Sequence, residues 1–242
     1  AGKIDFDTRL QLAQHHTAAH IINGVARRVL GNHVWQAGAS KSLEKARLDI
    51  THYDSLTDQE VSKIESMANE VIKNNIPVYK SFMDRNVAEA KYGFVLYQGG
   101  AVPGRQIRVV AISGLDVEAC GGTHLDLTGE VKQIKILKTS KVQDGIVRIE
   151  FTAGNAALKT VGAEKGILEE ASKILKVEID QLPGRVEELF EKWKKARKAS
   201  QKGKKLEPKE LEELKLTSTI AYKGEDILVK LAEILQTQPE HV

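Results

Sequence analysis

The hydrophobic pattern along the chain changes character near residue 155. Before that point, stretches with apolar residues at helical spacing alternate with short β-rich runs bounded by turns; after it, the strand signals largely stop. The predicted strands cover residues 47–53, 76–82, 106–112, 131–138 and 146–153. The pattern predicts an α+β domain with a mixed or antiparallel sheet over residues 1–154, followed by a C-terminal helical region over residues 155–242.

Two helices are predicted in the first domain. Residues 7–31 form the first, with Asp7 or Thr8 as the N-cap and Gly31 just past its C-terminal end. The second follows the sequence TDQE at residues 57–60, which has the form of a capping box. Its apolar positions lie at helical spacing and comprise Val61, Ile64, Ala68, Val71 and Ile72.

The C-terminal region is predicted to contain helices over residues 155–176 and 183–200. Pro183 stands near the start of the latter, where a missing N–H costs little. Its apolar face consists of Val186, Leu189, Phe190 and Trp193. Residues 167–182 resemble residues 227–242, and the second copy stops where the first continues into its next helix. We therefore expect the chain to be truncated within a repeated helical unit.

Composition narrows the class of protein. The chain has 242 residues, with 41% hydrophobic and 29% charged, which is typical of a soluble globular protein. It has no apolar run long enough for a membrane span and no secretory signal at its start, so we expect a cytoplasmic protein. A single cysteine cannot form an internal disulfide, in keeping with a reducing compartment.

The sequence HHTAAH, from His15 to His20, is the first chemical signal. On a helix, residues four apart lie about 40° apart on one face, so His16 and His20 can bind one ion together. His15 and His20 are five apart and are rotated by about 140°, so His15 points elsewhere.

The sequence CGGTH, from Cys120 to His124, is the second signal. It offers a thiolate and a third imidazole, and Gly121 and Gly122 would let the backbone turn tightly between them. Three nitrogens and one sulfur in tetrahedral geometry suit Zn²⁺. Each motif alone is weak: paired histidines are often surface residues, and a lone cysteine is usually a small buried apolar residue. The metalloprotease motif H-E-x-x-H requires Glu directly after the first histidine, and Thr17 follows His16 instead.

Four stretches of this sequence resemble the editing domain of alanyl-tRNA synthetase: HHTAAH, QAGASKSLEKARLDITHY, VPGRQIRVVAISGLDVEACGGTH and GIVRIEFTAG. The resemblance covers residues 5–155 and extends more loosely through the helical part, which is similar to an archaeal-type synthetase. The free-standing AlaX proteins share similar motifs. Threonyl-tRNA synthetase has a related domain, but its second motif lacks the GGT spacing.

The resemblance implies hydrolysis of the ester in mischarged Ser-tRNA(Ala) and Gly-tRNA(Ala). It implies that zinc is bound by His16, His20, Cys120 and His124. It matches Gln36 to a glutamine that helps to shape the pocket, and Thr17 would contact the serine hydroxyl. Relatives often carry Thr just before the second histidine, where this chain has Ala19.

The mechanism stays open at the level of sequence. A catalytic zinc usually has three protein ligands and one open position, whereas four candidates are present here. Either one ligand is loose and zinc activates water, or zinc orients the substrate and other groups position the water. Candidate general bases are Asp49, His52, Glu118 and Asp126, each also consistent with an ordinary polar residue.

Three functions therefore remain: a deacylase, within a synthetase or of the AlaX type; a structural-zinc tRNA-binding module without catalysis; and a helical dimerisation piece on an inert core. Residues 191–205 contain eight Lys and Arg and one Glu, and could follow tRNA phosphates or form a solvated helix face. Lys41, Lys45 and Arg47 could meet the acceptor end. The apolar face with Phe190 and Trp193 could pack within a helical hairpin or join a homodimer.

Overall fold

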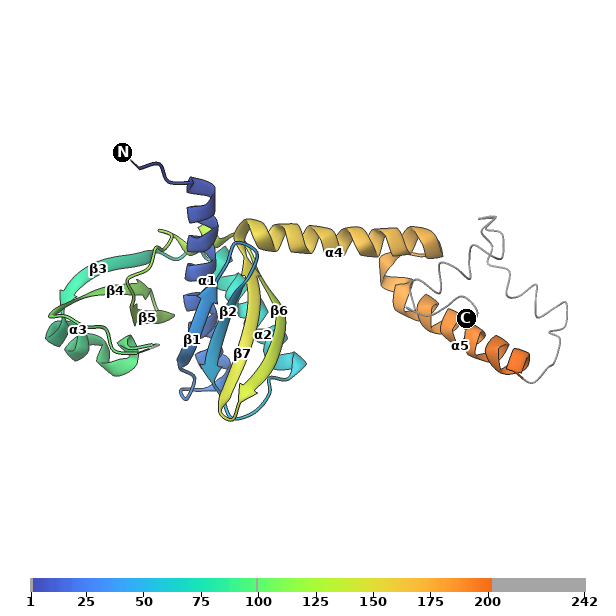
Figure 1. The fold of residues 1–242 in the computed structure, drawn as a ribbon, viewed down its shortest axis with the longest axis horizontal. Helices are drawn as coiled ribbons and strands as arrows, with labels where there is room; N and C mark the ends of the chain where they lie inside the picture. Colours follow the sequence, from blue (N-terminus) through green and yellow to red (C-terminus); the bar gives the residue numbers. More distant parts are fainter. Residues whose placement is uncertain (1, 99, 202–242) are drawn as a thin grey trace. The chain divides into compact units, whose positions relative to one another are not determined.

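The computed structural model describes residues 2–98 and 100–201 of the chain (Figure 1). Two compact units are present, and the division between them falls at Ile167 and Leu168, within one long helix. The first unit contains a four-stranded and a three-stranded sheet, both antiparallel. The predicted α+β class is therefore confirmed.

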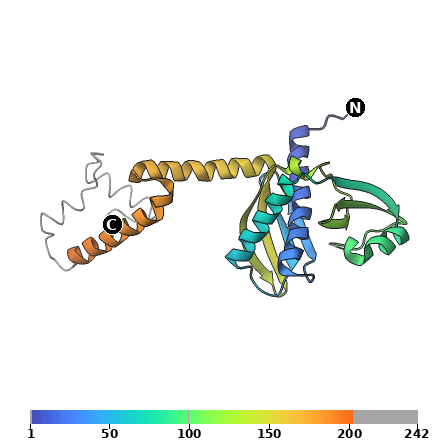
Figure 2. The same ribbon diagram turned by 180° about the vertical axis from the view of Figure 1, so that it is seen from behind.

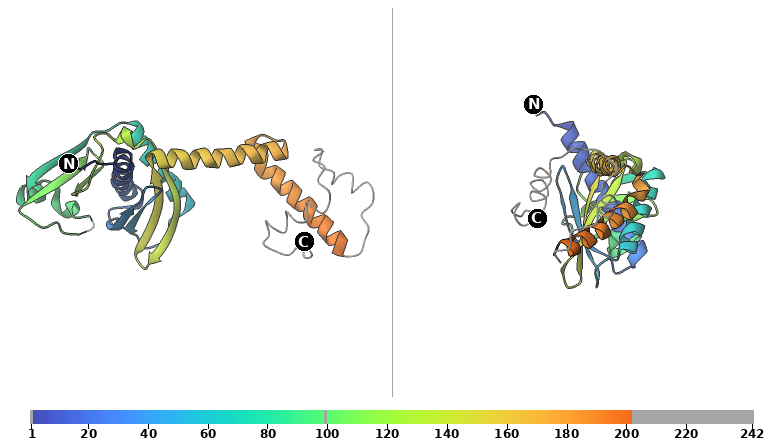
Figure 3. Two further views of the ribbon diagram at one scale, coloured as in Figure 1. Left: turned by 45° about the horizontal axis from the view of Figure 1, so that its top comes forward. Right: turned by 90° about the vertical axis from the view of Figure 1, so that its right-hand side faces the viewer.

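Helix α1 (Phe6–Leu30) is the central helix of the first unit. Its N-cap is Asp5, whose carboxylate accepts from the backbone N–H groups of Asp7 and Thr8, so the predicted N-cap was two to three residues late. The Thr8 hydroxyl also donates to Asp5, which explains why it does not cap the helix itself. Gly31 ends the helix with φ of 121°, as predicted. Figure 3 shows α1 between the two sheets.

The four-stranded sheet has the order β1-β2-β7-β6. Its strands are β1 (Gln36–Lys41), β2 (Ala46–Thr51), β6 (Ile134–Gln143) and β7 (Ile146–Ala153). Leu48 pairs with Ile149 and Ile50 with Val147, so these four apolar side chains share one face and enter the core. Helices α1 and α2 lie side by side over this sheet (Figure 2).

Helix α2 (Asp58–Lys73) has the predicted capping box between Thr57 and Glu60. It ends before Pro77, as its sequence requires. Its buried residues are Ile64, Ala68, Val71 and Ile72, and Val61 is half-buried. A single turn of 3₁₀ helix, η2 (Thr128–Val131), packs against it.

The three-stranded sheet consists of β3 (Val78–Asp84), β4 (Gln106–Ile112) and β5 (Asp116–Ala119). Helix α1 contacts β5, while α3 (Arg85–Tyr92) and η1 (Gly93–Leu96) cover the opposite face. A small separate core forms under α3 and η1 from Ala88, Leu96, Ile107, Val109 and Ala119.

The C-terminal helices are α4 (Gly154–Leu175) and α5 (Leu182–Gln201), joined through η3 (Ile179–Gln181), close to the predicted limits. Phe190 and Trp193 are half-exposed, and their rings stack with centroids 5.6 Å apart. The predicted second repeat copy and the basic residues after Gln201 lie outside the described residues. Among the described helices, none is long and apolar enough to span a bilayer.

Candidate metal centre

Four side chains from two distant segments converge on one point beside α1. His16 and His20 come from the middle of α1, Cys120 directly follows β5, and His124 lies four residues later. One ligand atom from each side chain lies within 4.8 Å of the others. The two motifs that the sequence singled out therefore form one cluster.

The distances in the cluster fit a tetrahedral metal. The Cys120 Sγ lies 3.4 Å from His16 Nε2 and 3.3 Å from His124 Nε2. A zinc ion bound at about 2.3 Å by sulfur and about 2.0–2.1 Å by nitrogen would separate these atoms by roughly 3.5 Å. The donor set of one thiolate and three imidazoles thus fits Zn²⁺ in both chemistry and spacing.

Gly122 allows the turn after Cys120 to approach α1. A Cβ atom at this position would lie 1.9 Å from the His16 Cε1. Neither Gly121 nor Gly122 has a positive φ, and a Cβ at Gly121 would meet nothing within 4 Å. The sequence argument assigned both glycines to a tight backbone turn. The structure instead shows a need for space, and only at Gly122.

Thr17 is fully buried and lies against the third imidazole. Its hydroxyl oxygen accepts from the Leu125 backbone N–H at 3.2 Å and lies 3.3 Å from His124 Nδ1. Metal-binding histidines usually donate their other ring N–H to an acceptor of this kind, which fixes the tautomer. The geometry therefore suits Thr17 to orienting His124.

Two buried carboxylates bracket His20. Asp116 Oδ2 lies 3.3 Å from His20 Nδ1, and Glu118 Oε2 lies 3.4 Å from His20 Nε2. Both carboxylate side chains are at most 4% exposed. Asp116 can therefore orient the His20 ring through Nδ1, while Glu118 lies beside the other ring nitrogen.

Arg108 on β4 holds the metal-binding turn. One terminal nitrogen of its guanidinium donates to the Cys120 carbonyl at 2.8 Å and to the Gly122 carbonyl at 2.7 Å. The Arg108 carbonyl also accepts from the Cys120 N–H at 3.0 Å. The turn is thus fixed to the strand on both sides of Gly121.

The electrostatics of the cluster favour a thiolate. Burial raises the pKa of Cys120, but hydrogen bonds from His124, His16 and His20 outweigh this effect and lower the pKa to about 2. Burial lowers the pKa of His124 to about 4, so its ring is neutral at physiological pH. A thiolate and a neutral imidazole are the protonation states that bind metal. Burial lowers the pKa of His20, but Glu118 and Asp116 outweigh this effect and raise it to about 10, so His20 would release a proton on binding a metal.

Gln36 lies at the start of β1, and its backbone N–H donates to Gln98 Oε1 at 3.0 Å. The same oxygen lies 3.5 Å from Asn23 Nδ2, which donates to Glu118 Oε1 at 3.0 Å. A polar chain therefore links the backbone of Gln36 to the Glu118 carboxylate beside His20.

The other candidate bases lie in separate interactions. Asp49 accepts two hydrogen bonds from Arg148 at 2.7 and 2.9 Å, and Asp126 forms an ion pair with Lys80. His52 Nδ1 lies 2.8 Å from the Nε2 of His33. Of the four, only Glu118 contacts a residue of the cluster.

Among the three possible tRNA contacts, Lys45 pairs with Glu150 and Arg47 lies 3.4 Å from Asp49.

Sequence reasoning missed the roles of Arg108, Asp116 and Gln98. One signal was present for Asp116, because DVEAC places Asp116, Glu118 and Cys120 at period two on one strand face. Nothing in the local sequence marks Arg108 or Gln98, since both reach the cluster only through tertiary contacts.

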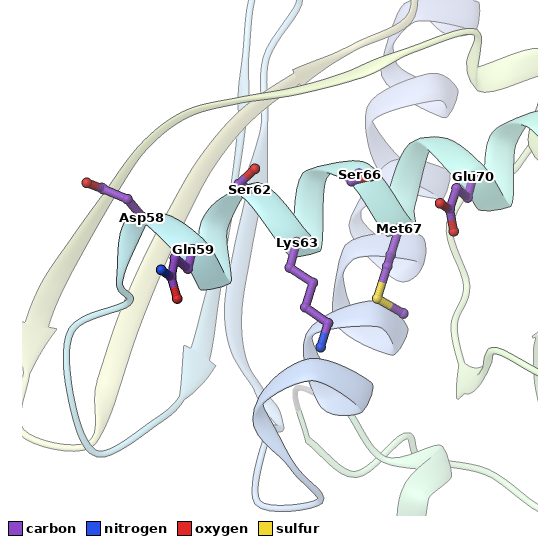
Figure 4. Close-up of a pocket in the computed structure, with 7 residues that line it drawn as sticks. All are labelled: Asp58, Gln59, Ser62, Lys63, Ser66, Met67 and Glu70. Carbon is purple, nitrogen blue, oxygen red and sulfur yellow. The ribbon is translucent and has the colours of Figure 1, made fainter.

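A pocket on α2 is unrelated to the cluster. Figure 4 shows that its lining side chains all come from the one helix, and include Asp58, Lys63 and Glu70. None of the four converging residues lines it, and a hollow along a single polar helix face offers no convergent chemistry.

Comparison with known proteins finds a family model and several alanine–tRNA ligases that this chain resembles. The family model for the threonyl and alanyl tRNA synthetase second additional domain matches residues 107–150. The alanine–tRNA ligase of Methanopyrus kandleri is 52% identical over 196 residues, 81% of this chain and 21% of that protein. The alanine–tRNA ligase of Methanothrix thermoacetophila is 53% identical over 197 residues, 81% of this chain and 22% of that protein.

The corresponding ligase of Methanothermobacter thermautotrophicus is 52% identical over 196 residues, again 81% of this chain and 22% of that protein. The chain thus spans about one fifth of the length of these relatives. The expected resemblance is confirmed: this chain is a relative of the archaeal alanine–tRNA ligases, in a segment that carries the second additional domain of threonyl and alanyl tRNA synthetases.

Proposed function

We propose that this chain is a zinc-dependent aminoacyl-tRNA deacylase that hydrolyses the ester of Ser-tRNA(Ala) and Gly-tRNA(Ala). One observation carries the proposal: three imidazoles and one thiolate converge within 4.8 Å in a chain related to alanine–tRNA ligases. The tRNA part of the proposal is supported by the family match over residues 107–150.

The physical need for such an activity is clear. Serine adds one hydroxyl to alanine and glycine lacks one methyl group, and a binding pocket separates such neighbours by only about 100-fold. A second, hydrolytic site with polar groups can stabilise the serine hydroxyl while leaving the methyl group of alanine against unpaired polar atoms.

We assign the metal to His16, His20, Cys120 and His124. When bound there, zinc would act as a Lewis acid on the ester or on a nearby water molecule. Thr17 and Asp116 hold the rings of His124 and His20 in place through the contacts given above. Thr17 has no exposed surface, so we propose that it is a positioning residue rather than the contact for the serine hydroxyl.

Gln36 is proposed to line the substrate pocket, supported by the link from its backbone through Gln98 and Asn23 to the Glu118 carboxylate beside His20. Of the four candidate bases Glu118 alone contacts the cluster, and burial raises its pKa to about 8, so we propose that it takes part in proton transfer near neutral pH. We propose that residues 1–154 form this catalytic domain, that residues 155–242 contribute tRNA binding or homodimer contacts, and that the protein acts in the cytoplasm.

A deacylation assay tests the proposal. The chain should release serine from Ser-tRNA(Ala) and leave Ala-tRNA(Ala) intact. Cys120→Ala and His124→Ala should each lower the rate by at least about 100-fold, because each removes a metal ligand. Wild-type protein with a full complement of zinc and no release of serine or glycine would contradict the proposal.

A second candidate function is favoured by the number of ligands. Four protein ligands complete a tetrahedral zinc site, which is typical of structural zinc. In that case the chain would bind tRNA, with steep dependence on salt, and would not hydrolyse it. One of the basic residues on α5 that could bind tRNA already has contacts within the helix: Lys194 Nζ lies 4.5 Å from the Phe190 ring centroid and 2.8 Å from a carboxylate oxygen of Glu191. tRNA binding that depends on salt, with no hydrolysis, would favour this function.

A further inference from the structure

The three-stranded sheet places an exposed aromatic residue in the same row as a candidate metal ligand. Phe82 on β3 pairs with Arg108 on β4, and the register between these strands is regular. The Cys120 N–H donates to the Arg108 carbonyl at 3.0 Å, which extends the pairing to the residue after β5. Because directly paired residues share a face, these three side chains form one row across the sheet.

The row lies on the face of the sheet that meets α1. The neighbouring row on this face contains Glu118, whose carboxylate lies 3.4 Å from His20 Nε2 on α1. Within the row, the Arg108 guanidinium bonds the Cys120 and Gly122 carbonyls. Phe82 is thus the direct neighbour of the side chain that holds the metal-binding turn, with a Cβ separation of about 5 Å expected for such a pair.

Phe82 does not serve the core. Its side chain is 73% exposed, and it belongs to neither hydrophobic cluster of the first unit. A flat, exposed aromatic ring beside cationic groups is the usual platform for an unpaired nucleobase. A cationic group is present, because Arg108 is the direct neighbour of Phe82 on the adjacent strand.

We propose that Phe82 stacks on the base of the 3′-terminal nucleotide of bound RNA, so that the sugar ester of that nucleotide faces the metal centre. The inference rests on the proposed function for the identity of the RNA. To the proposed function it adds Phe82 as the residue that positions the terminal nucleotide.

The same strand provides a matched control. Tyr79 is 61% exposed, but it lies on the opposite face of the sheet, in a pocket with Tyr92 and Val117. Its ring therefore cannot reach a nucleotide at the metal centre. Phe82→Ala and Tyr79→Ala each remove one exposed aromatic ring. The ring is lost from the face that meets α1 in the first variant and from the opposite face in the second.

The experiment measures binding of two uncharged RNA hairpins at one stated salt concentration. Both end in a single-stranded CCA tail, and one lacks the terminal base. The wild-type chain should bind the intact hairpin about tenfold more tightly than the abasic one, because one base–aromatic stack is lost. Phe82→Ala should bind the intact hairpin about tenfold more weakly than wild type and should no longer distinguish the two hairpins. Phe82→Trp and Tyr79→Ala should behave as wild type.

Zinc content and thermal unfolding are measured for every variant, and Phe82→Leu replaces Phe82→Ala if the latter is not folded. Wild type that binds both hairpins equally, or a Phe82 variant that still discriminates between them, would overturn the inference. No hydrolysis is needed in this assay. Failure of the deacylase proposal and failure of the stacking proposal are therefore seen separately.

Discussion

At the scale of single residues, the candidate metal centre depends on one close approach between the CGGTH turn and α1. Gly122 leaves room for the His16 ring, whereas Gly121, one position earlier, faces open space. A methyl group at Gly122 would collide with the His16 ring, whereas a methyl group at Gly121 would meet nothing. Glycine is therefore needed at position 122 because of space, and not at position 121.

We expect Gly122→Ala to weaken zinc binding by about 10- to 100-fold, in the range seen when groups that support metal ligands are changed. The added Cβ would overlap the His16 ring, so either the ring or the turn must move. Competition with a chelator of known affinity measures the effect. Gly121→Ala is the control and should bind zinc as wild type does. Equal affinities for the two variants would show that the turn does not approach His16 as described.

A second prediction concerns the side chain that holds the turn. Arg108→Lys should weaken zinc binding by about tenfold or more, because the flexible lysine stem does not hold its ammonium in place as the planar guanidinium holds the nitrogen that bonds both carbonyls. Arg85→Lys is the matched control, since Arg85 also donates to the backbone carbonyls of a loop, at Val102 and Gly104, away from the centre. If the two variants bound zinc equally well, Arg108 would have no specific role in the site.

At the scale of elements, a histidine pair joins the loop after α1 to the end of β2. His33 Nε2 lies 2.8 Å from His52 Nδ1, and the two rings stack with Tyr53 beside them. The pair can share one proton across this contact, but two protons would bring two N–H groups face to face. Burial lowers the pKa of His52, and the charge of His33 lowers it further, while Glu60 and Asp54 act in the opposite direction.

This shift predicts a pH dependence of stability. Because the pKa of His52 is lower in the folded chain than the ordinary histidine value of 6.5, the unfolded chain binds more protons at mildly acidic pH. The stabilisation is present above pH 6.5 and is lost as the pH falls through that value. We expect the free energy of unfolding of His52→Gln to fall less between pH 7 and pH 5 than that of wild type. Denaturant unfolding of both proteins cancels the contribution of the metal-binding histidines, and parallel curves would contradict the prediction.

Some of the strands and helices could be predicted from the sequence, and others could not. Strands β4 and β7 begin and end where their β-branched runs do, because their apolar residues carry the signal. Strand β1, with the sequence QAGASK, has no β-branched residue and was missed; it exists because it pairs with β2. The short helix α3 was also missed, because it packs on a sheet that the sequence does not delimit.

The candidate site divides in a similar way. Spacing within one helix and within one turn identified the four converging side chains, because i, i+4 geometry is local. The groups around them come from positions far away in the sequence, so only the fold brings them together. Arg108 bonds the turn across two strands, and Gln98 links Asn23 on α1 to the backbone of β1.

At the scale of the whole first unit, the four converging side chains connect α1 to the three-stranded sheet. His16 and His20 belong to the helix that packs on the four-stranded sheet, and Cys120 follows the last strand of the other sheet. A bound metal would therefore hold the two parts of the unit together as well as form the site.

The central claim is that one zinc ion is held by these four side chains, and metal analysis combined with X-ray absorption at the zinc edge tests it most directly. The predicted result is one zinc per chain, coordinated by one sulfur and three nitrogens, with the sulfur signal absent in Cys120→Ser. A chain that is folded and fully loaded with zinc but shows only oxygen and nitrogen ligands would contradict the claim, as would a folded chain that binds no zinc at all.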